Sequence, residues 1–469
     1  MEKVERKKKY RLKGKVITVI LCVLCLGIGL GVGVRISRPT TNVDVETNDL
    51  VNEIINILDD KWVDVTDSEE NMQDRMVDGL VNNLGDAYTN YMSIDELNDF
   101  VSSINGSFVG IGVSFIAIDD GGLVLDVYKD TPAYNAGIKA GDVLIESNGA
   151  SLTGLNSTEI KEKVVGEENS QVRIKVLRDN KELIFNMVRK SVEIDVEYEV
   201  YDSFGYLNII TFGDSTADHV ETALKAFKNK DVKNIVIDVR DNSGGYLTAV
   251  QGILNLLVPD DQVIYKMQDK DGTVYETTAD NKSVYEFDKG FILMNGESAS
   301  ASEVMIGALT EVLDYKTIGA QSFGKGIAQT TVTLSNGSSL KYTNAKWLTP
   351  SGKCIHNEGF MPDYEVEEDI ISNYVYSEFK DEYQYDDVNN NIAVMQKMLK
   401  RLGYDVDRVD GYFSAKTKEA LMEFQEDNGI KEDGILTYTL TKKLYGKVAV
   451  EIYQNSEDKV LNKVIELLK

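Results

Sequence analysis

Cysteine and histidine are scarce in this 469-residue chain, which has three of the first and two of the second. Cys22 and Cys25 lie inside one apolar run, so Cys354 alone remains elsewhere and no disulfide framework can form within one chain. His219 and His356 are far apart in sequence and have no cysteine partners. The sequence therefore predicts neither a disulfide-stapled fold nor a His/Cys metal site.

Basic residues are also few relative to acidic ones, with 50 Lys or Arg against 77 Asp or Glu and a net charge of -27. Such a chain would be repelled by phosphates, which argues against a nucleic-acid partner. The basic residues are concentrated at one end, because residues 1–15 carry eight Lys or Arg and two Glu. This segment is predicted to be a basic cytoplasmic tail.

The segment 16–34 is the one long run without a charge, VITVILCVLCLGIGLGVGV. As a helix it would be about 28 Å long, close to the thickness of a bilayer core. Because the basic tail precedes it, the positive-inside rule predicts a single-pass membrane anchor with the other domains outside the cytoplasm. A cleaved signal peptide is the alternative, but the sequence after the run, RISRPTTN, offers no small-x-small cleavage site.

The remaining chain is predicted to be multidomain, with mixed α/β and α+β architecture, because its length suggests about three folded units. Helical spacing comes first, including a capping box from Ser93 to Glu96, followed by short strands with Gly turns and then by alternating strands and helices. The predicted segments are 49–104 (helical), 105–191 (short strands), 192–369 (α/β core), 370–391 (acidic, Tyr-rich linker), 392–446 (small C-terminal unit) and 447–469 (tail helix).

The stretch GAQSFGKGIAQ, residues 319–329, is one residue short of the phosphate-binding pattern GxxxxGK[ST]. Gly326 stands where that pattern needs a hydroxyl, and the alternating residues that follow predict a strand instead of a helix. A nucleotide site is therefore not expected. Lys325 needs another explanation.

Upstream, FILMNGESASASEVMIGALTEVL predicts a strand, a turn of small residues and a helix, with Ser300 at the corner. A serine there would expose its hydroxyl beside free helical amides, as a nucleophile requires. From these residues alone, a helix cap formed by Ser298, Ser300 and Ser302 is the favoured interpretation. A second turn of this kind, RDNSGG, could place the backbone amides of Gly244 and Gly245 near that of Ala301 as an oxyanion hole, or it could be only a turn.

A hydrolytic serine also needs a base, and both histidines are poor candidates, since His219 lies in an amphipathic helical segment and His356 in a Gly-flanked stretch. Lysine can act only when it is neutral, which requires burial to lower its pKa. Lys325 lies between two glycines where the chain can pack tightly. It is therefore the candidate base.

Together these motifs resemble the carboxyl-terminal processing peptidases, or tail-specific proteases. The resemblance rests on SASASE, FGKGIAQ, DVRDNSGG, LTPSGKCIHNEGFMPD, LGDAYTNYM and GSFVGIGV, and it extends over about 49–368. It implies a Ser300/Lys325 dyad supported by Gln329, acyl transfer to water, a homodimer, and no metal or organic cofactor. Ser243 departs from the proline that is usual in the family's Asn-Pro-Gly-Gly.

Two further segments resemble binding modules. FVGIGV followed by TPAYNAGIKAGDVLIESNG is similar to a PDZ domain, which implies that the amides of a loop of four residues capture a substrate's C-terminal carboxylate. The four residues are Gly110, Ile111, Gly112 and Val113. The unit 392–446 resembles a three-helix peptidoglycan-binding domain through its ordered set of Gln396, Leu399, Gly403, Asp410-Gly411, Thr417, Ala420, Phe424-Gln425 and Asp433-Gly434.

The sequence thus predicts a membrane-anchored, extracytoplasmic serine endopeptidase whose PDZ domain recognises protein C-terminal tails and whose C-terminal domain binds peptidoglycan. Two alternatives stay open. One is an inactive protease-like scaffold that binds tails and cell wall, and the other is an acyl hydrolase that uses the same Ser/Lys pair on esters.

Overall fold

The computed structural model describes residues 51–58, 72–178, 181–280, 284–368, 371–374, 376, 382–455 and 457–469. The anchor predicted for 16–34 lies outside these residues. Among those described, no helix combines the length and apolar character needed to cross a bilayer. The chain divides into two compact units, 1–75 and 76–469. In the first, residues 51–58 are helical and α3 (Met72–Asn82) begins.

The segment before the PDZ-like domain contains β1 (Asn90–Met92) and α4 (Ile94–Ile104). The predicted capping box is confirmed at the start of α4. The Glu96 amide donates to Ser93 Oγ at 3.3 Å, and the Ser93 amide donates to Glu96 Oε2 at 2.7 Å. These two bonds satisfy amides that the helix itself leaves without partners.

The PDZ-like domain is an antiparallel sheet in the order β3-β4-β5-β7-β8, with β6 paired to β5 and with two helices packed on it. A two-stranded ribbon, β2 (Ser107–Gly110) with β9 (Lys190–Glu193), carries the chain into and out of it. The elements are β3 (Val113–Ile118), β4 (Gly121–Val127), α5 (Pro132–Ala136), β5 (Val143–Ser147), β6 (Ala150–Ser151), α6 (Ser157–Val164), β7 (Gln171–Arg178) and β8 (Lys181–Val188).

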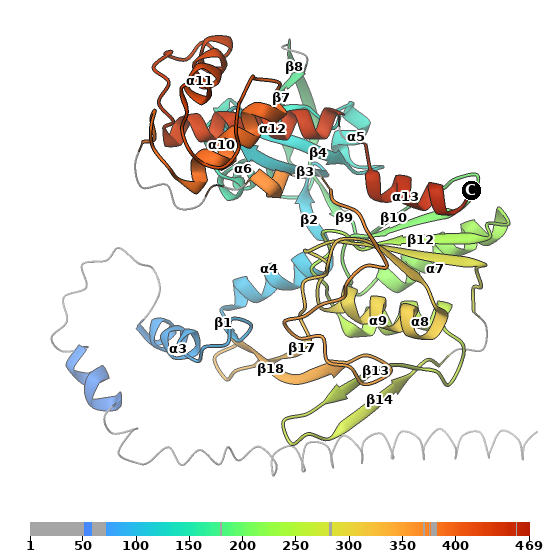
Figure 1. Ribbon diagram of the computed structural model, residues 1–469. Helices are drawn as coiled ribbons and strands as arrows, with labels where there is room; N and C mark the ends of the chain where they lie inside the picture. Colours follow the sequence, from blue (N-terminus) through green and yellow to red (C-terminus); the bar gives the residue numbers. More distant parts are fainter. Residues whose placement is uncertain are drawn as a thin grey trace, which may run out of the picture. The chain divides into compact units, whose positions relative to one another are not determined.

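The α/β core is built on a six-stranded sheet in the order β10-β11-β12-β15-β16-β19, parallel from β11 onward. Helices α7, α8 and α9 pack in the main hydrophobic core of this unit (Figure 1). The elements are β10 (Val196–Val200), β11 (Gly205–Ile209), α7 (Thr216–Asn229), β12 (Asn234–Asp238), α8 (Leu247–Leu257), β15 (Lys289–Met294), α9 (Ala301–Leu313), β16 (Lys316–Gly319) and β19 (Tyr364–Glu365).

A second, antiparallel sheet in the core has the order β1-β18-β13-β14, with β17 paired to β18. Its strands are β13 (Val263–Gln268), β14 (Val274–Thr278), β17 (Ile327–Thr333) and β18 (Ser339–Leu348). A strand therefore follows Lys325, as the alternating residues predicted. The sheet also joins β1, from the helical segment, to the strands on which Gln329 and Lys341 lie.

The C-terminal domain is helical, as predicted, and has a hydrophobic core of its own. Its elements are η1 (Ile371–Tyr374), α10 (Asn390–Arg401), α11 (Ala415–Asp427) and α12 (Tyr438–Asn455). Helix α12 also contacts the PDZ-like domain, because Ala449 packs against Ile118 and Leu123, and Lys443 Nζ lies 2.7 Å from Asp120 Oδ1.

The segment predicted as one tail helix, 447–469, contains the second half of α12 and a separate helix, α13 (Lys459–Leu467). Val460 and Val464 on α13 are fully buried against the sheet of the α/β core. Asp458, at the start of α13, pairs with Arg240 of the RDNSGG turn at 2.8 Å. The last residues of the chain are thus part of the core that holds the candidate site.

Candidate active site

Ser300 lies at the corner between β15 and α9, with φ 55° and ψ −112°. A positive φ is uncommon for a residue with a side chain, and strained corners of this kind occur at catalytic nucleophiles. Its two neighbouring serines differ from it. Ser298 and Ser302 are fully buried, and their hydroxyls donate to the carbonyls of Val239 and Asn242.

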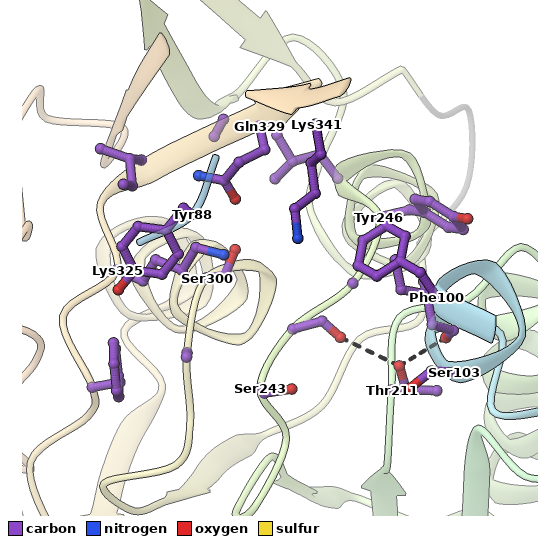
Figure 2. A pocket seen from close by; sticks show the side chains of 18 of the residues that line it. Tyr88, Phe100, Ser103, Thr211, Ser243, Tyr246, Ser300, Lys325, Gln329 and Lys341 are labelled. Atoms are coloured by element: carbon purple, nitrogen blue, oxygen red, sulfur yellow. Dashed lines mark hydrogen bonds between the residues drawn. The ribbon is translucent and has the colours of Figure 1, made fainter. Parts of the chain in front are cut away.

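Ser300 opens into a cavity of about 510 Å³. Figure 2 shows the side chains of Ser300 and Lys325 directed into this same pocket. In the described part of the chain, no hydrogen bond joins the Ser300 hydroxyl to the Lys325 ammonium. The residues that line the pocket include Tyr88, Ser243, Gly244, Gly245, Ser300, Lys325, Gln329 and Lys341.

Lys325 is half-buried, and its Nζ lies 4.7 Å from the centre of the Tyr88 ring. Burial lowers the pKa of Lys325 from its ordinary value of 10.5, and the positive charge of Lys341 lowers it further. The negative charges of Glu303 and Asp86 act in the opposite direction. Desolvation is the largest of these effects, so the site favours the neutral amine more than water does.

Glu303, in the first turn of α9, is a fully buried acid that the sequence analysis did not single out. Its carboxylate oxygens accept four hydrogen bonds, three of them from residues in the segment 322–325. The donors are the amide of Ser300 (2.9 Å), the hydroxyl of Ser322 (2.7 Å), the amide of Gly324 (2.7 Å) and the amide of Lys325 (2.8 Å). Glu303 therefore links the turn at Ser300 to the segment 322–325, which contains Lys325.

Replacing Glu303 by glutamine is expected to destabilise the core by about 2 to 5 kcal/mol, because an Nε2 group would face N–H and O–H donors that then lack an acceptor. We also expect kcat to fall by roughly 10- to 100-fold, since a small displacement of the dyad has effects of this size. The fluorescence of Trp347, whose Nε1–H donates to the Lys325 carbonyl, would follow unfolding next to the site. Trp62, the other of the chain's two tryptophans, would be replaced by phenylalanine in the parent chain and in every variant, so that Trp347 alone gives the signal.

Glu311→Gln is the matched control, because Glu311 lies on the same helix and is exposed. Its two hydrogen bonds from Ser351 are exposed to solvent, so its change in unfolding free energy is expected to be at most about 1 kcal/mol, well below that of Glu303→Gln. Equal free energies of unfolding for Glu303→Gln and Glu311→Gln would show that Glu303 does not hold the Ser300 turn and the segment 322–325 together.

The RDNSGG turn places two glycines against the serine corner. A Cβ on Gly244 would lie 2.9 Å from the Ser300 Cβ, and a Cβ on Gly245 would lie 2.4 Å from the Phe212 carbonyl oxygen. Both residues also have positive φ, 115° and 146°, so only glycine fits there without strain.

The amides of this turn have different surroundings. The Gly244 N–H donates to Asn242 Oδ1 at 2.9 Å. Within the described residues, the amides of Gly245 and Ala301 donate no hydrogen bond. Of the three amides predicted for the oxyanion hole, these two are without an acceptor in this conformation, and Gly244 would have to leave Asn242 before it could donate to a substrate carbonyl.

Gln329 lies on β17 and lines the pocket. Its Nε2–H points to Thr343 Oγ1 at 3.5 Å, and no hydrogen bond joins it to Lys325 among the described residues. A role for Gln329 in orienting the lysine therefore stays a prediction.

Tyr88 is a second pocket residue that the sequence analysis did not assign. It belongs to LGDAYTNYM, where the Tyr88 amide and the Thr89 hydroxyl donate to Asp86 at 3.0 and 2.6 Å. Thr89 Oγ1 in turn accepts from the amide of Thr343 on β18. The motif thus presents the Tyr88 ring to Lys325, and its place within the resemblance was the available signal.

The predicted carboxylate-binding loop of the PDZ-like domain runs from Gly110, the last residue of β2, to Val113, the first residue of β3. Ile111 is buried with 1% of its surface exposed, and Gly112 has φ 84°. In the part of the chain that is described, the amides of Ile111 and Gly112 donate no hydrogen bond. Because β3 is an edge strand of its sheet, a peptide could extend the sheet beside this loop.

Comparison with known protein families gives three matches, in the predicted order along the chain. A PDZ domain matches residues 109–188, Peptidase family S41 matches residues 203–366, and a peptidoglycan binding domain matches residues 388–444. The resemblance to carboxyl-terminal processing peptidases and the combination of three modules are therefore confirmed.

Curated relatives match over most of the chain. A carboxy-terminal processing protease, CtpB of Bacillus subtilis (strain 168), is 32% identical over 398 residues, which are 83% of this chain and 82% of that protein. A CtpA-like serine protease of Staphylococcus aureus (strain N315) is 31% identical over 456 residues, 96% and 91% of the two chains. Among solved structures, the photosystem II D1 C-terminal processing protease is 25% identical, with a TM-score of 0.43, over 67% of this chain and 87% of that one.

Proposed function

We propose, since this chain belongs to the carboxy-terminal processing serine proteases of peptidase family S41, that it cleaves peptide bonds with a Ser300/Lys325 dyad and selects proteins by their free C-terminal tails. The observation that carries this proposal is the strained Ser300 corner facing a half-buried lysine in one pocket. The two buried serines beside it already have backbone partners, which leaves Ser300 as the nucleophile.

In the proposed reaction, neutral Lys325 accepts the proton of Ser300 as Ser300 Oγ attacks the substrate carbonyl carbon. The amides of Gly245 and Ala301 donate to the oxyanion, with Gly244 if it leaves Asn242. The C–N bond then breaks, and Lys325 returns its proton to the amine leaving group. Water, deprotonated by Lys325, attacks the ester carbonyl. The bond to Ser300 Oγ breaks, Ser300 takes the proton back from Lys325, and the new carboxyl terminus is released.

Selection by the tail is tested with two forms of one unfolded substrate, which end in the same apolar tail with either a free carboxylate or an amide. The free form is expected to have a roughly 10- to 100-fold lower KM, because two loop amides donate to a charged acceptor in that form alone. Equal KM values would reject tail recognition by this loop and leave the dyad untouched.

A serine-reactive probe addresses the inactive-scaffold alternative. The proposal expects labelling of the wild-type chain and none of Ser300→Ala. A peptide and an ester that share one acyl group would separate a peptidase from an esterase.

We place the enzyme at the bacterial cell membrane, held by 16–34 with residues 1–15 in the cytoplasm, where it would act on envelope proteins. The C-terminal domain would keep it near peptidoglycan, and the working form would be a homodimer. These parts rest on the charge asymmetry of the N-terminal segment, on the peptidoglycan-binding match and on the family resemblance.

A further inference from the structure

Three side chains that could ligate a metal meet at the exit from the PDZ-like domain. Glu193 ends β9, Asp195 lies two residues later, and His219 is in the first turn of α7. One ligand atom from each of the three lies within 4.8 Å of the other two. None of them belongs to the proposed catalytic machinery.

Asp195 is the unusual member of this group. It is 2% exposed, and its Oδ1 lies 2.7 Å from His219 Nδ1. Its other oxygen, Oδ2, is buried and has no hydrogen-bond partner among the described residues. A buried carboxylate oxygen without a partner is costly and rare in native proteins, so an ion pair with His219 alone does not account for this side chain.

The surroundings suit a cation that arrives from solvent. Glu193 is exposed, and the side chain of His219 is 46% exposed, so the site is open on one side. A histidine nitrogen with two carboxylates is a donor set used for Zn²⁺ and similar divalent transition metals. Open positions around such an ion would be filled by water.

We propose that Glu193, Asp195 and His219 bind one divalent transition-metal ion of the Zn²⁺ type. The scarcity of cysteine and histidine argued against a His/Cys site, but here two of the three ligands are carboxylates. This inference is independent of the proposed function.

The position of the site suggests what the ion would do. Glu193 lies on the ribbon strand β9, which pairs with β2, and β2 leads directly into the tail-binding loop. His219 lies on a helix of the α/β core. A shared ion would therefore fasten the exit strand of the PDZ-like domain to the core.

Zn²⁺ binding is measured on the full chain by competition with a chromophoric chelator. The visible absorption spectrum of Co²⁺ bound in place of Zn²⁺ shows the type and number of the ligands. Cys22, Cys25 and Cys354 are first replaced by serine, because thiols would bind both ions elsewhere. We expect one site per chain, with affinity at least about tenfold weaker in His219→Ala. Glu193→Gln, at an exposed side chain, is expected to weaken binding without disturbing the fold.

His356→Ala is the matched control, since it removes the only other histidine. It is expected to keep the full affinity and the Co²⁺ spectrum. The proposal is overturned if the parent chain binds no Zn²⁺, in which case Asp195 and His219 form only a hydrogen-bonded pair. It is also overturned if His219→Ala and His356→Ala bind Zn²⁺ with equal affinity.

Discussion

Replacing Ser300 by alanine is expected to lower kcat/KM for peptide cleavage by at least about 10⁴-fold, because the attacking oxygen is removed and no other residue can form the acyl-enzyme. The fold should be retained, since the Ser300 hydroxyl opens into a pocket and its amide still donates to Glu303. Substrate binding should persist, so KM or a direct binding constant would change little.

The SASAS run itself provides the controls. Ser298→Ala and Ser302→Ala each remove a buried hydroxyl that donates to a backbone carbonyl, so each is expected to cost about 1 to 3 kcal/mol of stability. Both should nevertheless keep the acyl-enzyme chemistry and react with a serine-directed probe. If Ser300→Ala still cleaved, or if one of its neighbours lost labelling instead, the nucleophile would be assigned wrongly.

Replacing Lys325 by alanine is expected to lower kcat at every pH by at least about 10³-fold, because the general base is lost. In the wild type, only neutral Lys325 can accept the Ser300 proton, so activity should rise with pH through the pKa of this lysine. Burial, and then Lys341, lower that pKa. The rise should therefore occur at lower pH than an ordinary lysine would give.

Lys341→Gln tests the sign of this effect. Removing the like charge should raise the pKa of Lys325, which moves the rise in activity to higher pH and lowers activity near neutral pH. Lys353→Ala, at an exposed lysine, should leave the profile unchanged. The measurement is the pH profile of kcat/KM for the wild type, Lys325→Ala, Lys341→Gln and Lys353→Ala. A Lys325→Ala enzyme as active as the wild type would exclude Lys325 as the base.

The resemblance to known families predicted the module order, and local patterns predicted the strand-turn-helix around Ser300. They also excluded a nucleotide site, because a strand follows Lys325. Such features depend on a few consecutive residues, whose periodicity and turn chemistry are set by the backbone itself. The capping box at Ser93 is of the same kind, since both of its hydrogen bonds join residues three apart.

The contacts that complete the site could not be predicted in this way. Glu303 has the sequence position of a helix-capping acid, yet three of its four donors lie 19 to 22 residues away. Tyr88 reaches Lys325 through the pairing of β1 with β18, more than 200 residues apart. The apolar face of α13 is visible in its sequence, but the sheet that it covers is not.

Short segments of the chain indicate which chemistry it can attempt, because a serine at a strand-to-helix corner, a lysine between glycines and a glycine-rich turn each depend on a few consecutive residues. The packing of distant segments shows that Ser298 and Ser302 are buried, what lowers the lysine pKa and which buried acid joins the two loops. Burial and charge proximity arise when distant segments pack together, and no short stretch of sequence encodes them.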